Sequence, residues 1–167
     1  PGDETLVTAI ELVERETGPH HVSSDIGCHL FASLPPFNIG SSTMGYGLGP
    51  AAASAFNVKG TAGKPVKRAI SMIGDGGFWH NGLTTGIANA VFNKDDGILV
   101  IMKNGYSSAT GTQELPSSPT HSEHKAADMS IERALQGLGV AWTRTVHPYH
   151  VGEMQSTIKE AMASGYK

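Results

Sequence analysis

One carboxylate and one carboxamide are the side chains of this chain whose positions most clearly suggest a chemical role. Asp75 lies between two glycines at the end of an apolar run. Twenty-seven residues then separate Gly76 from Asn104, which lies at the end of the next apolar run. Because the carboxyl ends of parallel strands meet at one edge of a sheet, we expect the two side chains to lie together. Carboxylate and amide oxygens suit Mg²⁺ or Ca²⁺. The structural alternative is that Asp75 only caps a helix at a tight turn.

The glycines after Asp75 indicate that an anion binds beside the metal ion. Gly76 and Gly77 stand where a helix would open, and free backbone N–H groups and the helix dipole favour negative charge there. Mg²⁺ usually takes one or two protein oxygens and completes its shell with water and substrate phosphates. The pattern therefore predicts a diphosphate bridged to the protein by a metal ion.

The elements that must position these residues alternate between strands and helices. Near-continuous apolar runs predict buried strands over residues 67–74 and 97–105, on either side of a helix rich in small residues over 80–93. Further helices are predicted over 3–18, 49–58, 128–139 and 151–165, further strands over 20–27 and 140–147, and loops over 33–50 and 106–125. This alternation predicts an α/β fold with a three-layer, doubly wound and mostly parallel sheet.

The composition narrows the class of protein. Of 167 residues, 39% are hydrophobic and 16% are charged, as in a globular domain with a core. A net charge of −3 without a run of Lys or Arg gives no electrostatic case for nucleic acid, and no apolar run approaches the roughly 20 residues of a membrane span. Cys28 is the only cysteine, which excludes an internal disulfide and a clustered-cysteine metal site. We therefore expect a cytoplasmic protein.

The two ends of the sequence suggest a part of something larger. The chain begins without methionine and stops directly after a helical pattern, where an α/β chain would normally enter another strand. We expect residues 1–167 to form a single domain that belongs to a longer chain or complex.

The spacing from the Gly-Asp-Gly turn to Asn104 resembles the thiamine diphosphate-binding motif. In that family the aspartate, the asparagine and a backbone carbonyl two residues later hold Mg²⁺. The resemblance implies Asp75, Asn104 and the carbonyl of Tyr106 as the ligands here. The sequence departs from the common double asparagine of the motif, because Lys103 precedes Asn104.

Three further stretches make the resemblance more specific. DIGCH (25–29) and YSSATGTQ (106–113) are similar to segments of the 2-oxoacid:ferredoxin oxidoreductases. GGFWHNG (76–82) resembles a run in the α subunit of the indolepyruvate ferredoxin oxidoreductases, and an aryl-pyruvate substrate is implied by this run alone. The resemblance implies oxidative decarboxylation of a 2-oxo acid to acyl-coenzyme A, with the thiazolium as electron sink and iron–sulfur centres as electron acceptors.

The resemblance also implies which side chains surround the cofactor. Met44 would wedge between its two rings, although ordinary core filling is the alternative. Cys28 would lie against the thiazolium, or else be a small buried hydrophobe. The implied cofactor-binding residues are Gly27, Cys28, Met44, Gly74, Asp75, Gly76, Gly77, Asn104, Tyr106, Ser108 and Thr110.

Two histidines and two hydroxyl residues have open roles. His80 and His29 would face the substrate as acid–base groups, and the alternative for both is helix capping or packing. Ser108 and Thr110 would bond the diphosphate or the substrate, or else cap their own loop.

Several parts of such an enzyme have no candidate in this sequence. The glutamate that activates the pyrimidine ring lies in this family on a separate pyrimidine-binding domain, and one cysteine cannot hold an iron–sulfur cluster. We therefore expect a partner pyrimidine-binding domain, a ferredoxin or iron–sulfur domain, coenzyme A bound elsewhere in the full enzyme, and an oligomer. The alternatives are a non-oxidative thiamine diphosphate enzyme, such as a decarboxylase or acetolactate synthase relative, and an α/β module that binds no cofactor.

Overall fold

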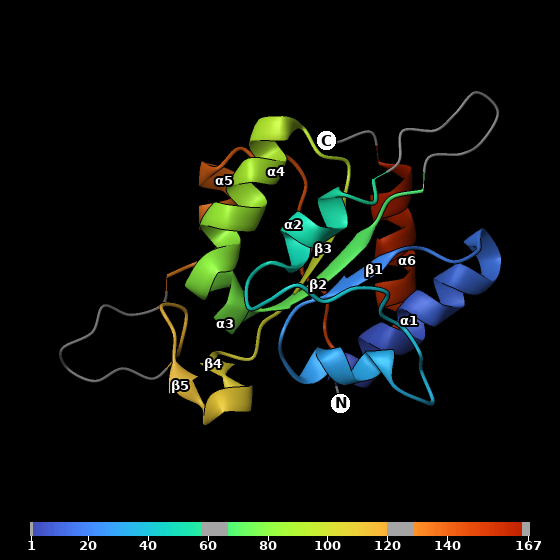
Figure 1. Cartoon of the computed structure of the whole chain (residues 1–167), viewed down its shortest axis with the longest axis horizontal. Helices are drawn as coiled ribbons and strands as arrows, with labels where there is room; N and C mark the ends of the chain where they lie inside the picture. Colours follow the sequence, from blue (N-terminus) through green and yellow to red (C-terminus); the bar gives the residue numbers. More distant parts are fainter. Residues whose placement is uncertain (1, 58–66, 120–128, 165–167) are drawn as a thin grey trace.

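A three-stranded parallel sheet lies at the centre of the computed structural model, which describes residues 2–57, 67–119 and 129–164 (Figure 1). Its strands are β1 (Val22–Ser24), β2 (Ile70–Gly74) and β3 (Ile98–Met102), in the order β1-β2-β3. Ile70 in the middle strand pairs with Val22 on one side and with Ile98 on the other. The parallel sheet predicted from the sequence is confirmed, and the carboxyl ends of its strands meet at one edge.

Helices cover both faces of this sheet, which confirms the three-layer architecture (Figure 1). On one face α1 (Gly2–Thr17) packs against α6 (Val151–Ala163). The other face carries α2 (Gly49–Ser54), α3 (Asp75–Gly77), the π-helical η2 (Phe78–Ile87), α4 (Ala88–Asn93) and α5 (Ile131–Gly137). None of the helices in the described ranges is long and apolar enough to cross a membrane.

Alternate side chains of β2 enter two different hydrophobic clusters. Ile70 and Met72 pack with residues of α1 and α6, whereas Ile73 packs with Phe78 and Leu135 on the opposite face. Successive side chains of a strand point to opposite faces, so a strand covered on both sides is mostly apolar, and the one polar side chain of β2, Ser71, is small and buried with its neighbours. This is why the sequence of β2 has no polar alternation.

Small residues let the helical segment that follows β2 approach its neighbours closely. A Cβ atom on Gly82 would lie 2.7 Å from Ile73 Cδ1, and one on Gly86 would lie 2.8 Å from Pro50 Cβ. Both distances are too short for a real side chain, so glycine is required at these two contacts. The segment from 75 to 93 is thereby held against both β2 and α2.

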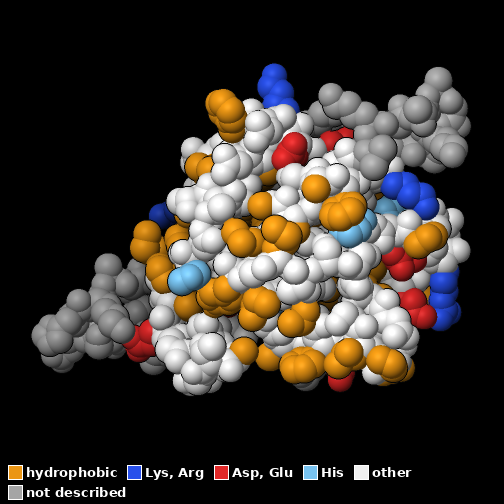
Figure 2. Space-filling view, viewed as in Figure 1, with side chains coloured by type: hydrophobic (Ala, Val, Ile, Leu, Met, Phe, Trp, Pro, Cys, Tyr) orange, Lys and Arg blue, Asp and Glu red, His pale blue; other side chains and the backbone are white. Residues whose placement is uncertain are grey.

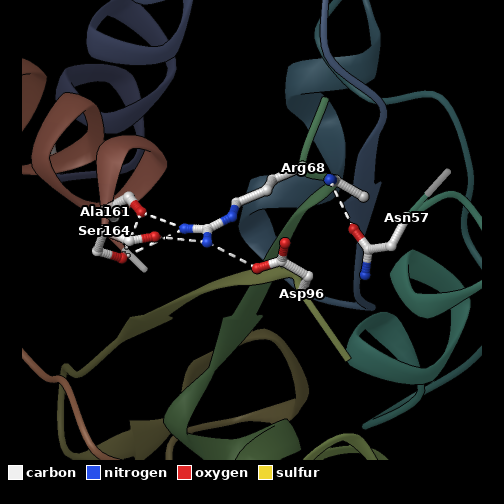
Figure 3. Close-up of polar contacts among 6 residues, drawn as sticks. Asn57, Arg68, Asp96, Ala161 and Ser164 are labelled. Carbon is white, nitrogen blue, oxygen red and sulfur yellow. Dashed lines mark hydrogen bonds and ion pairs between the residues drawn. The ribbon is translucent and has the colours of Figure 1, made fainter. Parts of the chain in front are cut away.

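A polar clamp fastens α6 to the amino edge of the sheet (Figure 3). Arg68, just before β2, donates hydrogen bonds to the carbonyls of Ala161 at 2.5 Å and Ser164 at 2.6 Å, and lies 2.7 Å from the carboxylate of Asp96. A cation at a helix C-terminus satisfies carbonyls that lack intrahelical partners. Asn57 Oδ1 accepts a bond from Ala69 N at 2.9 Å beside this clamp. These contacts fix the sheet at the edge opposite Asp75.

Two segments differ from the sequence prediction. Residues 140–147, predicted as a strand, do not form one, because their backbone pairs with none of the strands in the described ranges; with β3 they line a cavity of about 1040 Å³. The predicted loop over 106–125 contains a short antiparallel pair, β4 (Tyr106–Ser107) and β5 (Gln113–Glu114), and its residues 120–125 lie outside the described ranges.

Candidate functional site

Asp75 connects the carboxyl ends of β2 and β3. Its side chain is 1% exposed, and Oδ2 accepts hydrogen bonds from the backbone of Asn104 at 3.1 Å and of Gly105 at 2.7 Å. Oδ1 accepts a third bond from the N–H of Gly76 at 3.0 Å. Gly74, in an extended conformation, is the cap residue of the following helix. The Asp75 carboxylate therefore does more than close a turn, because it reaches across to the next strand.

Asn104 begins a closely hydrogen-bonded turn after β3. Its Oδ1 accepts a bond from Tyr106 N at 3.0 Å, and its Nδ2 donates to Ser108 Oγ at 2.7 Å. Gly105 has a φ of +85°, a left-handed conformation that favours glycine. The carbonyl of Gly105 accepts a bond from the buried Ser118 hydroxyl at 2.5 Å. The exposed carboxamide is thus held in one orientation next to the buried carboxylate.

Burial raises the pKa of the Asp75 carboxyl above its usual range, and the backbone N–H groups of Gly105, Gly76 and Asn104 act in the opposite direction. A carboxylate offers about four lone-pair directions, and these N–H groups use three of them. The backbone N–H of Asp75 itself also acts on its own carboxyl, whereas Tyr106 N takes one of the two lone pairs of the Asn104 amide oxygen.

This pair of oxygens fits Mg²⁺ better than a transition metal. Hard oxygen donors without imidazole or thiolate are typical of Mg²⁺ and Ca²⁺ sites. Among the described residues, no three His, Cys, Asp or Glu side chains group into a metal site. An ion at Asp75 and Asn104 would therefore complete its shell with backbone carbonyl, water or phosphate oxygens, as Mg²⁺ commonly does.

The glycines that open α3 make room for protein side chains. A Cβ atom on Gly76 would collide with the hydroxyl of Tyr46, and one on Gly77 would collide with Oδ2 of Asp25. Around Gly74, by contrast, a Cβ atom would meet open space. The sequence pattern assigned these glycines to the approach of a diphosphate. The structure adds a second reason, because neighbouring loops press against two of them.

Asp25 is a candidate site residue that the sequence pattern did not single out. It follows β1 directly and is fully buried, and both of its carboxylate oxygens accept the N–H of Gly47, at 2.9 and 2.8 Å. Burial raises the pKa of Asp25, whereas backbone hydrogen bonds and the charge of His80 lower it. The carboxylate anchors the loop 43–48 at the carboxyl end of β1. Its only sequence signal was an aspartate near the end of the strand predicted over 20–27.

The loop anchored by Asp25 carries Met44. Met44 is 68% exposed, which excludes the core-filling alternative. Tyr46, two residues later, places its hydroxyl 2.9 Å from Ser107 Oγ and its ring 4.9 Å from the ring of His80. The loop therefore contacts both the hairpin after β3 and the helix after β2, while Met44 stays open to solvent. Sequence reasoning did not identify Tyr46 or Ser107.

Gly27, Cys28 and His29 stand at the start of η1 (Cys28–Ser33) and differ in exposure. Cys28 is exposed, so it is not a buried small hydrophobe. His29 is 4% exposed, its Nε2 has no hydrogen-bond partner, and burial lowers the pKa of its ring against the opposing charge of Asp3. A Cβ atom on Gly27 would lie 2.7 Å from the His29 ring. His29 is therefore packed beneath η1, whereas Cys28 is accessible to a ligand.

His80 is the exposed member of the Phe-Trp-His run. Phe78 is fully buried and meets the ring of Trp79 edge-on at 4.9 Å, and Trp79 Nε1 donates to Ser117 Oγ at 2.8 Å. Both rings belong to the hydrophobic cluster between β2 and α5. Phe78 and Trp79 therefore pack inside the domain, on the inner side of the helix, and His80 is left on its exposed side.

Ser108 and Thr110 lie on the exposed η3 (Ser108–Thr110), between β4 and β5. Thr110 Oγ1 donates to Gln113 Oε1 at 2.6 Å, and Gln113 Nε2 donates to the carbonyl of Thr110 at 2.6 Å. Ser108 Oγ accepts from Asn104. In this structure both hydroxyls are engaged within their own loop, which is the capping arrangement, and that loop continues directly from Asn104.

Comparison with protein families assigns the chain. The model for the C-terminal TPP-binding domain of thiamine pyrophosphate enzymes matches residues 25–166. The chain belongs to this family. The matched range of this thiamine pyrophosphate-binding domain includes Asp25, Asp75 and Asn104, and the resemblance inferred from the sequence motifs is confirmed.

Curated relatives of this thiamine pyrophosphate-binding domain are subunits of oxidoreductases. It is 31% identical over 148 residues to indolepyruvate oxidoreductase subunit IorA of Pyrococcus horikoshii, covering 83% of this chain and 23% of that protein. It is 32% identical over 155 residues to subunit IorA of Archaeoglobus fulgidus, covering 92% of this chain and 24% of that protein. The chain thus spans about a quarter of the length of these relatives.

A solved structure shares the fold of the domain. The 2-oxoglutarate:ferredoxin oxidoreductase from Magnetococcus marinus, solved with 2-oxoglutarate, coenzyme A and succinyl-CoA bound, superimposes with a TM-score of 0.78 at 19% sequence identity. The match covers 96% of this chain and 57% of that chain. The α/β architecture built around the β1-β2-β3 sheet is therefore that of a known 2-oxoacid:ferredoxin oxidoreductase chain.

Proposed function

We propose that this domain binds the diphosphate of thiamine diphosphate through Mg²⁺ held by Asp75, Asn104 and the backbone carbonyl of Tyr106. The observation that carries the proposal is the direct link between the first two residues, since Asp75 Oδ2 accepts the N–H of Asn104 at 3.1 Å. The exposed carboxamide of Asn104, whose oxygen accepts one hydrogen bond from Tyr106 N, supports the same assignment. Membership of the thiamine pyrophosphate-binding family supports thiamine diphosphate as the cofactor.

We further propose that the domain is part of a 2-oxoacid:ferredoxin oxidoreductase that converts a 2-oxo acid to acyl-coenzyme A. The proposed substrate is indolepyruvate or another aryl-pyruvate. The bound cofactor supplies an electron sink for decarboxylation. Asp75 and Asn104 would hold the metal, and the glycine turn at the start of α3 would lie beside the diphosphate. Met44 would contact the cofactor rings, Cys28 would lie at the site, and His80 would meet the substrate as an acid–base group.

This function requires parts that other chains or domains provide. We propose that a pyrimidine-binding domain supplies the activating glutamate and that a ferredoxin or iron–sulfur domain accepts the electrons, in an oligomeric assembly in the cytoplasm. The domain covers about a quarter of its curated relatives, which leaves room for such domains. Hydrophobic side chains gather over η1 in Figure 2, and Ile26, Phe31 and Leu34 around this segment are exposed, which suits contact with a neighbouring domain.

Calorimetry tests the metal site directly. Thiamine diphosphate is titrated, with and without Mg²⁺, into the full-length protein that contains this domain, assembled with its partner subunits. We expect Mg²⁺-dependent binding that Asp75→Ala abolishes. The matched control is Asp95→Ala, which removes a carboxylate at the amino end of β3 and leaves binding unchanged. Unchanged Mg²⁺-dependent binding by Asp75→Ala would overturn the assignment.

A second measurement separates the oxidative reaction from the non-oxidative alternative. The assembled enzyme is supplied with indolepyruvate or another 2-oxo acid, coenzyme A and a one-electron acceptor. For each 2-oxo acid consumed, we expect one acyl-coenzyme A to form and two acceptor molecules to be reduced, because oxidative decarboxylation releases two electrons. Release of aldehyde or acetolactate-type products without acceptor reduction would identify a non-oxidative enzyme instead. Absence of any thiamine diphosphate binding would identify a module without cofactor.

A further inference from the structure

Two hydroxyl groups join loops that come from different strands. The hydroxyl of Tyr46 lies 2.9 Å from Oγ of Ser107, sixty-one positions later in the chain, and both residues are partly buried. Resting on the proposed function, we propose that Tyr46 and Ser107 are a pair of positioning residues. They hold the loop that carries Met44 against the loop that carries Asn104 and Tyr106, and so set the affinity of the site for Mg²⁺ and thiamine diphosphate.

The Tyr46 side of this contact is fixed at its base. The N–H of Gly47, the next residue, donates to both carboxylate oxygens of the fully buried Asp25, so the loop is anchored where β1 ends. Gly47 has a φ of +81°, and a Cβ atom there would lie 2.7 Å from the Cβ of Asn81. Tyr46 therefore extends from a backbone that is held by β1 and pressed onto the helix after β2.

The hydroxyl of Tyr46 also lies against the turn that begins with Asp75. A Cβ atom on Gly76 would collide with this hydroxyl and would lie 3.0 Å from Ser107 Oγ. The N–H of the same Gly76 donates to Oδ1 of Asp75, the proposed metal ligand. The hydroxyl pair thus rests on the peptide that orients the proposed metal ligand.

Ser107 lies in the loop that carries Asn104 and Tyr106, two of the proposed metal ligands. Ser107 follows Tyr106, whose N–H donates to Asn104 Oδ1, and precedes Ser108, whose hydroxyl accepts from Asn104 Nδ2. The Tyr46–Ser107 bond therefore restrains the three-residue segment from which two metal ligands are proposed. This bond joins the loop that is anchored at the end of β1 to the loop after β3, next to the turn after β2. Losing it releases the loop that carries Asn104 and Tyr106 but leaves every proposed metal ligand in place.

A double-mutant cycle tests this pair. Tyr46→Phe keeps the ring and its contact with His80 but removes the hydroxyl, and Ser107→Ala removes the partner hydroxyl. Both single variants and the double variant are made in the full-length protein, assembled with its partners. The Mg²⁺ concentration at half-saturation of thiamine diphosphate binding is measured by calorimetry. Tyr149→Phe and Ser156→Ala, both exposed and close to or within α6, are the matched controls.

We expect each single variant to raise the half-saturating Mg²⁺ concentration about 3- to 10-fold, the loss that one partly buried hydrogen bond accounts for. The double variant is expected to equal the single variants, because both changes break the same bond. The proposal is overturned if the singles match the controls, if their effects multiply in the double variant, or if only the thermal unfolding midpoint falls. Absence of Mg²⁺-dependent binding in the wild-type protein would instead reject the proposed function.

Discussion

Oδ2 of Asp75 lies 2.7 Å from the backbone nitrogen of Gly105, so one buried carboxylate holds the loop after β3 against the end of β2. The side chain of Asn104, beside Gly105, is exposed and bonds only within its own turn, to Tyr106 N and Ser108 Oγ. The two proposed metal ligands therefore differ in how much of the local structure depends on them.

This difference predicts unequal effects of two alanine substitutions. Asn104→Ala is expected to weaken Mg²⁺-dependent cofactor binding about 10- to 100-fold with little loss of stability. Asp75→Ala is expected to abolish binding and also to destabilise the domain by about 2–3 kcal/mol, because it leaves buried N–H groups without an acceptor. Hydrogen exchange of the Gly105 amide in the assembled protein checks the second effect. Equal exchange in the two variants would contradict this assignment of roles.

The glycines of the Gly-Asp-Gly-Gly turn are predicted to tolerate substitution unequally. Gly77→Ala places a Cβ atom against Asp25 Oδ2 and 3.0 Å from Ile73 Cγ1, both of which are buried. We expect a loss of about 1–3 kcal/mol in the free energy of unfolding, as for other overpacked sites. Gly74→Ala meets nothing within 4 Å and is the control. Denaturant unfolding of the two variants compares them, and equal stability would refute the close packing.

Met44 is predicted to affect cofactor binding without affecting stability. Its side chain is 68% exposed, so Met44→Ala removes almost no contact from the folded domain. If Met44 packs against the cofactor rings, the same change reduces affinity for thiamine diphosphate about tenfold. Calorimetry and thermal unfolding of one preparation measure both effects. An unchanged affinity would remove Met44 from the proposed site.

His29 is predicted to make stability depend on pH. Burial lowers the pKa of its ring, so the unfolded chain takes up a proton before the folded domain does. The stability contributed by neutral His29 is fully present above about pH 6.5 and is lost as pH falls through the lowered pKa. We expect His29→Phe to reduce the fall in unfolding midpoint between about pH 7.5 and about pH 5.5. An identical fall in both proteins would show that His29 does not titrate with unfolding.

The order of the elements and the Asp75–Asn104 pairing could be read from the sequence, because both depend on short-range patterns. Apolar runs of strand length mark β2 and β3, and one helical crossover must return their carboxyl ends to the same edge. The predicted strand over 140–147 is absent because pairing is not local: a segment forms a strand only where a neighbouring backbone is close enough to bond, and none of the described strands pairs with it.

By itself the sequence determined the parallel α/β sheet, the helix boundaries to within a few residues and the spacing of Asp75 and Asn104. Only the tertiary structure decided that Asp25 accepts the N–H of Gly47 and that the hydroxyls of Tyr46 and Ser107 form a hydrogen bond. These contacts join residues 22 and 61 positions apart, on loops whose paths no periodicity encodes. The physical reason is that a loop takes its conformation from the surfaces it lies on, whereas a strand or helix carries its pattern in its own residues.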